Sequence, residues 1–333
     1  MSGGLGMKHL NFWIRFVVLI AGLATASAQA QSLATTYPSR PVRMIIPYPP
    51  GGTTDVIGRM LAQKLSDVWH QPVVVENRAG AAGVVGSEYV ARSPPDGYTL
   101  VMGSGTTHSS GPAVNPRIPY NNLTDFTPVS LVVTFPNMLL VSPSVPARTV
   151  TEFIALLKAN PGKYNFASSG VGGTLHLAAE LFMMMSGTKM VHVSYKGPSA
   201  ATTDLLAGRV ECEFDNMASG WPLAQSGQLR ALGVTGLKRS PAAPDVPAIA
   251  EVLPGFEANS WVGLLMPAGV PDDIVRKFSS ETRRVLLEPE FARKLEEMGS
   301  APVGNTPEEF AAFIKQDTDR WRQVVKAAGI VMP

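Results

Sequence analysis

Short apolar, β-branched runs alternate with segments of helical period from residue 41 onward. Val42–Ile46 predicts a buried strand, and Asp55–Trp69 places its apolar residues at helical spacing. Val73–Val75 and Tyr98–Met102 predict two more strands, the second after a Pro-Pro-Asp-Gly turn at 94–97. Strands that alternate with helices indicate an α/β fold with a parallel sheet covered on both faces.

The alternation begins again after residue 141. Apolar runs at Val129–Val133 and Met138–Val141 are interrupted by Phe-Pro-Asn at 135–137, which we interpret as a crossing into a second lobe. Leu229–Val234 is interpreted as the return crossing. We therefore expect residues 36–134 and 229–333 to form lobe 1 and residues 135–228 to form lobe 2, with a hinge between them.

The remaining elements follow from the same reasoning. Residues 103–127 are rich in Gly, Ser, Thr, Asn and Pro and show no period, so no element is expected there. The expected helices are 150–159, 174–186, 200–207, 272–287, 289–298 and 307–327, and the expected strands are 164–167, 191–193, 210–214 and 261–266.

The first thirty residues have the pattern of a secretory signal peptide. Lys8 and Arg15 precede an apolar run from Phe16 to Ala24, and small-residue tripeptides follow at 26–28 and 28–30. The alternative is a membrane anchor, which needs about 20 apolar residues, more than this run offers. We expect residues 1–30 to be removed and the mature protein to reach the periplasm.

Charge and cysteine content exclude several classes of partner. The expected signal peptide holds two of the 28 Lys and Arg residues and none of the 26 acidic ones, so the mature chain has 26 of each. A neutral chain without a basic stripe indicates no nucleic-acid partner. Cys212 is the single cysteine, so no internal disulfide or structural zinc site is expected. We expect no cofactor and no metal.

Two glycine-rich turns, residues 49–55 and 168–174, each lie between a predicted strand and a predicted helix. Glycine lets the backbone approach a ligand closely. The first N–H groups of the following helix lack partners inside it and lie at its positive dipole end, which suits a carboxylate. The alternative is that the glycines only permit tight turns, with Asp55 and Thr174 capping the helices. Neither turn has a nucleotide-binding pattern.

Other polar residues suggest weaker hypotheses. His108, His176 and His192 lack metal-ligand spacing. Ser168, His176 and Asp215 could be imagined as a triad, but no Gly-x-Ser-x-Gly elbow surrounds Ser168, so we expect no catalysis.

Two polar residues follow predicted strands of the second lobe, as residues of a ligand cleft do in open α/β sheets. Tyr195 would contact the solute there, or would only cover the edge of the hydrophobic core. Asp215 would hold a cationic group of the solute, or serve in capping or in hinge hydrogen bonds.

At these residues the chain resembles the Bug family, the solute-binding components of tripartite tricarboxylate transporters. The resemblance extends from about Tyr37 to Ile330. It rests on the ordered motifs Tyr37–Arg43, Pro47–Gly52 with Asp55 and Arg59, Val75–Gly83, Asp96–Leu100, Asp125–Val129, Gly170–His176 and Tyr195–Gly197.

The resemblance implies a type II periplasmic-binding-protein fold, with two lobes, a hinge and a central ligand cleft. It implies that the first-lobe loop holds the solute's carboxylate, partly through ordered water, and that the second lobe closes over it. Tyr48 stands where the family commonly shows Phe and adds a hydroxyl. The matching positions are Tyr48, Gly51, Gly52, Thr53 and Asp55 in the first-lobe loop, with Gly172, Gly173 and Thr174 opposite, and the segment that holds Thr106 and His108 lines the cleft in relatives. Ser168, at the start of the second glycine-rich turn, is a further candidate ligand-binding residue.

These observations together predict a monomeric, non-enzymatic periplasmic protein that captures a small carboxylate for a tripartite tricarboxylate-type transporter. Its expected partners are the solute and membrane transporter subunits. Two alternatives stay open from the sequence: an exported sensor that presents solute to a membrane kinase, and an exported hydrolase.

Overall fold

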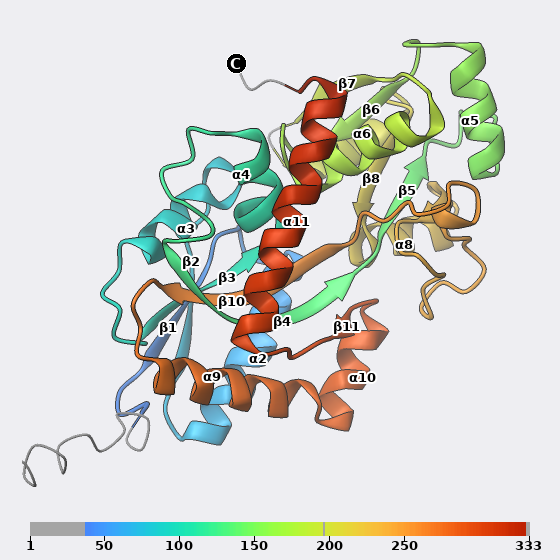
Figure 1. Cartoon of the computed structure of the whole chain (residues 1–333). Coiled ribbons are helices and arrows are strands. Elements are labelled where there is room, and N and C mark those ends of the chain that lie inside the picture. The colour runs from blue at the N-terminus through green and yellow to red at the C-terminus, as the bar shows by residue number, and fades with distance from the viewer. Residues whose placement is uncertain (1–36, 196, 331–333) are drawn as a thin grey trace, which may run out of the picture.

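The computed structural model describes residues 37–195 and 197–330, and the expected signal peptide lies outside these residues. Two β-sheets, each with apolar clusters on both faces, form two lobes that lie side by side (Figure 1). The final helix runs along both lobes. The molecule therefore has two cores and one shared covering helix.

The first sheet has the strand order β11-β4-β10-β3-β1-β2. Strands β1, β2 and β3 are parallel, and β10 runs antiparallel between β3 and β4. Alternate residues point to opposite faces, so Met44 and Leu100 join one apolar cluster while Ile45 and Val101 join another. The bounds are β1 Val42–Ile46, β2 Val73–Asn77, β3 Thr99–Ser104, β4 Phe126–Phe135, β10 Ser260–Pro267 and β11 Ala301–Pro302.

The second sheet has the order β7-β6-β8-β5-β9. Here β6, β7 and β8 are parallel, and β5 runs antiparallel between β8 and β9. This order repeats that of β2-β1-β3-β10-β4 in the first sheet, so both lobes follow one plan. The bounds are β5 Asn137–Val141, β6 Asn165–Ser168, β7 Val191–Ser194, β8 Cys212–Asn216 and β9 Arg230–Val234.

The chain crosses between the lobes twice. At the first crossing only Pro136 separates β4 from β5, where the sequence indicates an interruption. At the second crossing the chain passes from β9 to β10. Strand β9 pairs with β5, and its Leu232 and Val234 complete the second-lobe clusters. The return therefore lies after residue 234, later than the boundary at 229 that the pattern suggests.

Most helices begin and end where their apolar period predicts. Helices α5 and α6 coincide with the expected ranges, whereas α8 and the short helices between β3 and β4 are not anticipated. Gly220 and Pro222 obscure the period of α8. The helices are α2 Thr53–Trp69, α3 Val84–Ala91, α4 Gly111–Val114, α5 Val150–Ala159, α6 Thr174–Ser186, α7 Pro198–Leu206, α8 Met217–Gln225, α9 Asp272–Leu286, α10 Pro289–Glu297 and α11 Pro307–Ala328, with single turns η2 Ala81–Gly83, η3 Thr106–Ser110 and η4 Ile249–Glu251.

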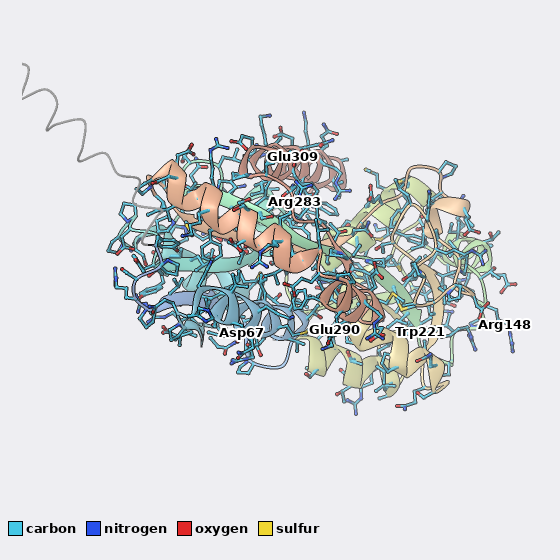
Figure 2. The ribbon with its side chains drawn as sticks, turned by 90° about the horizontal axis from the view of Figure 1, so that it is seen from below. Asp67, Arg148, Trp221, Arg283, Glu290 and Glu309 are labelled. Atoms are coloured by element: carbon cyan, nitrogen blue, oxygen red, sulfur yellow. The ribbon has the colours of Figure 1, made fainter. Side chains whose placement is uncertain are left out.

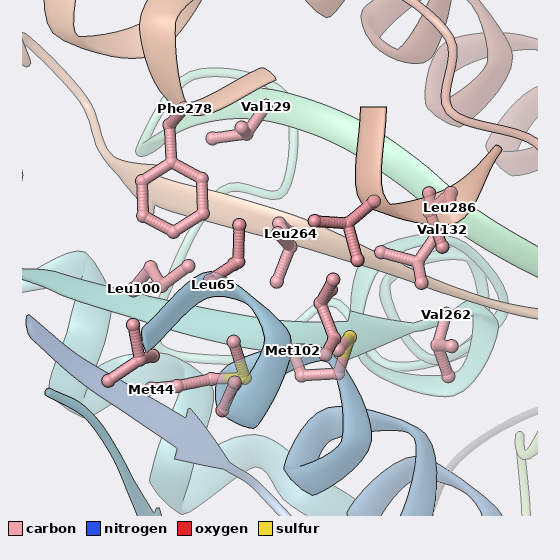
Figure 3. Close-up of a cluster of buried hydrophobic side chains, with 14 of the residues drawn as sticks. Met44, Leu65, Leu100, Met102, Val129, Val132, Val262, Leu264, Phe278 and Leu286 are labelled. Atoms are coloured by element: carbon pink, nitrogen blue, oxygen red, sulfur yellow. The ribbon is translucent and has the colours of Figure 1, made fainter. Parts of the chain in front are cut away.

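The largest core lies between the first sheet and helices α2 and α9 (Figure 3). Leu65 of α2 and Phe278 of α9 are fully buried against the strands. Burial of one such side chain stabilises the fold by about 1.5–3 kcal/mol. The outer faces of these helices carry charged residues, among them Asp67 of α2 and Arg283 of α9 (Figure 2). The apolar faces of α2 and α9 thus pack against the first sheet and hold its strands and loops in place.

Helix α11 contributes to the cores of both lobes. Thr306 and Glu309 form a capping box at its start. Phe310 packs in a first-lobe cluster with Trp261 of β10. Trp321 lies further along the same helix and belongs to the main second-lobe cluster. The helix therefore joins the two lobes on one side of the molecule.

Replacing Phe278 with Ala should lower the free energy of unfolding by about 3–5 kcal/mol, because it removes a fully buried ring and leaves a cavity. Urea titration followed by circular dichroism measures this. Leu287→Ala is the control, since Leu287 is 54% exposed, and its effect should stay within about 0.5 kcal/mol. Equal effects of the two substitutions would contradict the packing described.

Candidate functional site

The loop between β1 and α2 is held by the buried carboxylate of Asp55. The Gly51 N–H donates to Oδ2 at 2.9 Å, Asn77 Nδ2 donates to Oδ1 at 2.8 Å, and Arg59 Nε donates to Oδ2 at 3.0 Å. Burial opposes the charge, but the hydrogen bonds from Arg59, Gly51 and Asn77 outweigh it and lower the pKa of Asp55. The Asp55 carboxylate therefore does not cap α2 and is not free of partners. It holds the loop in place from inside the protein, and we call this set of hydrogen bonds the Asp55 brace.

Beyond this brace, the start of α2 presents bare backbone. Gly52 is the N-cap, and no side chain caps the helix there. The first hydrogen bond inside the helix runs from the Val56 N–H to the Gly52 carbonyl at 3.0 Å, so the N–H groups of Thr53 and Thr54 lie ahead of it. A Cβ built on Gly52 would meet no atom within 4 Å. These donors suit an anion because they lie at the positive end of the helix dipole.

Tyr48 connects this loop to the segment after β3. Its hydroxyl oxygen lies 2.6 Å from Ser104 Oγ, and the Ser104 N–H donates to Thr107 Oγ1 at 3.0 Å. Its ring lies against Gly83, where a Cβ would approach within 3.2 Å. Burial raises the pKa of Tyr48. The Tyr48 hydroxyl therefore has a hydrogen-bond partner within the protein.

The second-lobe loop repeats the design of the first. Gly51 and Gly172 both have left-handed φ angles, +89° and +84°, and each is followed by a glycine N-cap with no side-chain cap. The N–H of Gly172 donates to Nδ1 of His176 at 3.1 Å, four residues on, just as that of Gly51 donates to Asp55. Each loop thus has one N–H taken by a side chain and a bare helix start after it.

The two lobes meet at the segment after β3. The Thr174 N–H donates to Thr106 Oγ1 at 3.4 Å, and Ser110 Oγ lies 3.5 Å from Thr174 Oγ1. A Cβ on Gly172 would lie 3.2 Å from Val114 of α4. Tyr48, the residue directly before the first glycine-rich loop, also contacts this segment through Ser104. Residues 104–114 therefore contact the second glycine-rich loop and the residue that precedes the first one.

His108, expected in the cleft, lies instead inside the first lobe. Its ring is fully buried, stacks on Tyr120 at 6.0 Å between centroids and meets Phe126 edge-on at 4.6 Å. Burial lowers the pKa of His108 to about 3. The reason is local: residues 106–110 form one turn of π-helix that turns this side chain inward.

Tyr195 and Asp215 have partners within the second lobe. The Tyr195 hydroxyl donates to Asp204 at 2.8 Å. Asp215 accepts from Ser219 Oγ and from the Asn216 N–H, both at 2.7 Å. Asp215 is also part of β8 rather than of the loop after it. Burial and the neighbouring Asp215 raise the pKa of Glu213 to about 8. Tyr195 is also joined to the second glycine-rich loop, because its N–H donates to the Ser168 carbonyl at 2.9 Å.

The imagined catalytic triad does not assemble. Ser168 Oγ lies 2.7 Å from His192 Nε2 and donates to the Gly170 carbonyl, whereas His176 is engaged by Gly172 and Asp215 by Ser219. Burial and the adjacent His176 lower the pKa of His192 to about 4. The side chains of Ser168 and His192 therefore support the loop rather than form an acid-base relay with a carboxylate.

Two open hollows of about 430 and 450 Å³ lie elsewhere, on the outer face of the first lobe. They share Arg43 and Pro94. The other arginines that line them are paired with acids: Arg40 with Asp96, Arg78 with Glu76 and Arg92 with Glu88. We place the candidate site at the start of α2, where the backbone N–H groups have no side-chain cap, and at the start of α6, which contacts the first lobe through Thr106.

Sequence reasoning missed the residues that support the site. Asp317 of α11 accepts from Ser109 Oγ at 2.5 Å and from Trp261 Nε1 at 2.9 Å, which ties η3 to α11 and β10. Asn77 was visible only as part of a family motif. Within residues 37–195 and 197–330, no group of three or more His, Cys, Asp or Glu side chains is arranged to hold a metal ion.

Two lobes of one topology, joined by two crossings and each with a helix that begins at a glycine, are typical of a two-lobed solute-binding receptor. The chain matches the tripartite tricarboxylate transporter family receptor over residues 57–330. It therefore belongs to this family, whose members are periplasmic solute-binding receptors. The predicted type II periplasmic-binding-protein fold and the resemblance to Bug proteins are confirmed by the relatives described next.

Protein BugT of Bordetella pertussis is 38% identical over 309 residues, which cover 92% of this chain and 95% of BugT. A solved periplasmic transporter is 43% identical with a TM-score of 0.81, and covers 89% of this chain and 99% of its own. R. palustris Rpa4515, solved with adipate, is 36% identical with a TM-score of 0.83 and the same coverage. Among the described residues of this chain, no helix is both long and apolar enough to cross a membrane.

Replacing Asp55 with Asn should lower the free energy of unfolding by about 2 kcal/mol at pH 7, because hydrogen bonds to the charged carboxylate are lost. Since the folded pKa of Asp55 is lowered, its stabilising contribution is present above the unfolded value and disappears as pH falls through the folded value. The difference between wild type and variant should therefore shrink towards pH 3.

Urea titrations at pH 7, 5 and 3 measure this difference. Asp67→Asn, on the exposed face of the same helix, is the matched control and should change stability little at any pH. A difference for Asp55→Asn that stays constant from pH 7 to pH 3 would show that the charge does not brace the loop.

Proposed function

We propose that this protein binds a small carboxylate, with dicarboxylates first among the candidates, between its two lobes and delivers it to the membrane subunits of a tripartite tricarboxylate-type transporter. The observation that carries the proposal is the bare start of α2, where Gly52, Thr53 and Thr54 present backbone N–H groups ahead of the first helical hydrogen bond. The adipate in Rpa4515, a relative of the same fold, supports the ligand class.

Backbone donors are suited to a ligand that must be released. A hydrogen bond to a charged group contributes about 1.5–3 kcal/mol, so two or three of them support micromolar binding after the cost of association. The brace matters because Asp55 is itself an anion. Its charge is neutralised by Arg59 and by the hydrogen bonds from Gly51 and Asn77, which reduces its repulsion of a second carboxylate.

The second lobe supplies the matching half. Gly173 and Thr174 at the start of α6 lie against Thr106 of the first lobe, so a ligand carboxylate on α2 can be approached from α6 when the lobes meet. A ligand favours the closed state only through contacts that it makes there and not in the open state. A dicarboxylate has one carboxylate for each helix start.

Replacing Gly52 with Val should weaken adipate binding about 100-fold while the protein still folds. The backbone of Gly52 is extended, at φ −78° and ψ 166°, a conformation that valine adopts readily, and the added side chain meets no protein atom near Cβ. The branched side chain would occupy the space in front of the donors. Isothermal titration calorimetry measures the affinity, and thermal unfolding checks the fold.

Gln63→Val, on the exposed face of α2, is the matched control and should bind adipate as wild type does. The diamide of adipate should bind wild type weakly, because it lacks the negative charge that the helix starts favour. Normal binding by Gly52→Val, or equal binding of acid and diamide, would refute the anion site.

The full-length precursor should be cleaved during export, because its first thirty residues have a basic flank, an apolar run and small-residue cleavage sites. Mass spectrometry of the protein from the periplasmic fraction should find an amino terminus near Gln29 or Gln31. An intact Met1 in that fraction would contradict the prediction.

A further inference from the structure

His176 holds the second-lobe loop through its ring nitrogen. The side chain is 3% exposed, and Nδ1 accepts the Gly172 N–H at 3.1 Å. An acceptor nitrogen carries no proton, so this contact places the ring proton on Nε2, which faces Glu180 Oε1 at 3.4 Å. The hydrogen bond therefore requires the neutral imidazole in one tautomer.

The loop so held is the part of the second lobe that meets the first. Gly172 lies against Val114, and the next residues, Gly173 and Thr174, form the start of α6 that contacts Thr106. In the first lobe the equivalent N–H, that of Gly51, is taken by the carboxylate of Asp55, whose pKa is lowered. The two loops therefore share one geometry but differ in the chemistry of the group that fixes it.

We infer that His176 is a positioning residue: its unprotonated Nδ1 keeps residues 170–173 in the shape that brings the start of α6 to the first lobe and to the bound carboxylate. This inference rests on the proposed function and adds to it the residue that shapes the second-lobe half of the site.

The ring of His176 is held from several sides in the orientation that this contact needs. A proton on Nδ1 would face the Gly172 N–H, donor against donor, so the shape requires Nδ1 as an acceptor. Glu180 on the same helix lies at Nε2, and the ring of His192 on β7 lies 4.1 Å away between centroids. From β6 the ring meets the apolar Phe166.

His192 holds the beginning of the same loop. Its ring stacks on that of His176, and its Nε2 lies 2.7 Å from Ser168 Oγ. The Gly172 N–H itself donates to His176, so the shape of residues 170–173 depends on His176.

Two substitutions test the acceptor. In His176→Asn the side-chain Oδ1 takes the position of Nδ1 and accepts the Gly172 N–H, whereas His176→Leu removes the acceptor. Adipate affinity is measured by calorimetry at pH 7.5 for wild type and both variants.

His176→Asn should bind adipate as wild type does, and His176→Leu should bind it about fivefold more weakly. Met184→Leu, at an exposed position of the same helix, is the control and should keep the wild-type affinity. Wild-type affinity of His176→Leu, or equal weakening in His176→Asn and His176→Leu, would overturn the inference.

A second readout needs no ligand and separates the inference from the proposed function. Amide hydrogen exchange of Gly172, followed by nuclear magnetic resonance on the ligand-free protein, should be slow in wild type and in His176→Asn and about fivefold faster in His176→Leu. If adipate fails to bind wild type, the ligand proposal fails and this exchange alone decides the inference. Equal exchange in all three proteins would overturn it.

Discussion

An α-helix cannot satisfy its own first N–H groups, and this structure depends on how it treats that constraint at α2 and α6. Each helix begins at a glycine that supplies no side-chain cap. In each loop a side chain four residues on, Asp55 or His176, takes the N–H of the glycine before the cap. The loops are thereby fixed from within. The Thr174 N–H meets Thr106 of the first lobe, whereas the start of α2 has no side-chain cap. Rigid backbone donors are suited to reversible binding of an anion.

Much of the architecture was predictable because it depends on local patterns. Apolar runs and helical period fixed most elements, and the two glycine-rich loops were recognisable by their repeated placement between strand and helix. The order of strands was not, because pairing β10 between β3 and β4 joins residues more than 120 positions apart. Strand β9 looked like a crossing since its apolar residues serve both faces of the second sheet.

The candidate site was predictable in its loops but not in its side chains. His108 was expected beside the ligand, because nothing in the polar segment 103–127 signals the π-helical turn that points it into the core. Asp55 was recognised as important, yet only the fold shows that Arg59 and Asn77 surround its carboxylate. Tyr195 and Asp215 followed from a correct strand-end rule, but their hydrogen-bond partners come from neighbouring helices, which a linear pattern does not reveal.

The last eighty residues contribute to both lobes, and both cores depend on them. The first sheet lacks a central strand until β10 joins it, and the second-lobe cluster lacks Trp321 until α11 is in place. Neither core can therefore be completed by the chain up to β9, although that stretch contains nine of the eleven strands among the described residues. Both cores therefore become complete only when the carboxyl-terminal part of the chain is present.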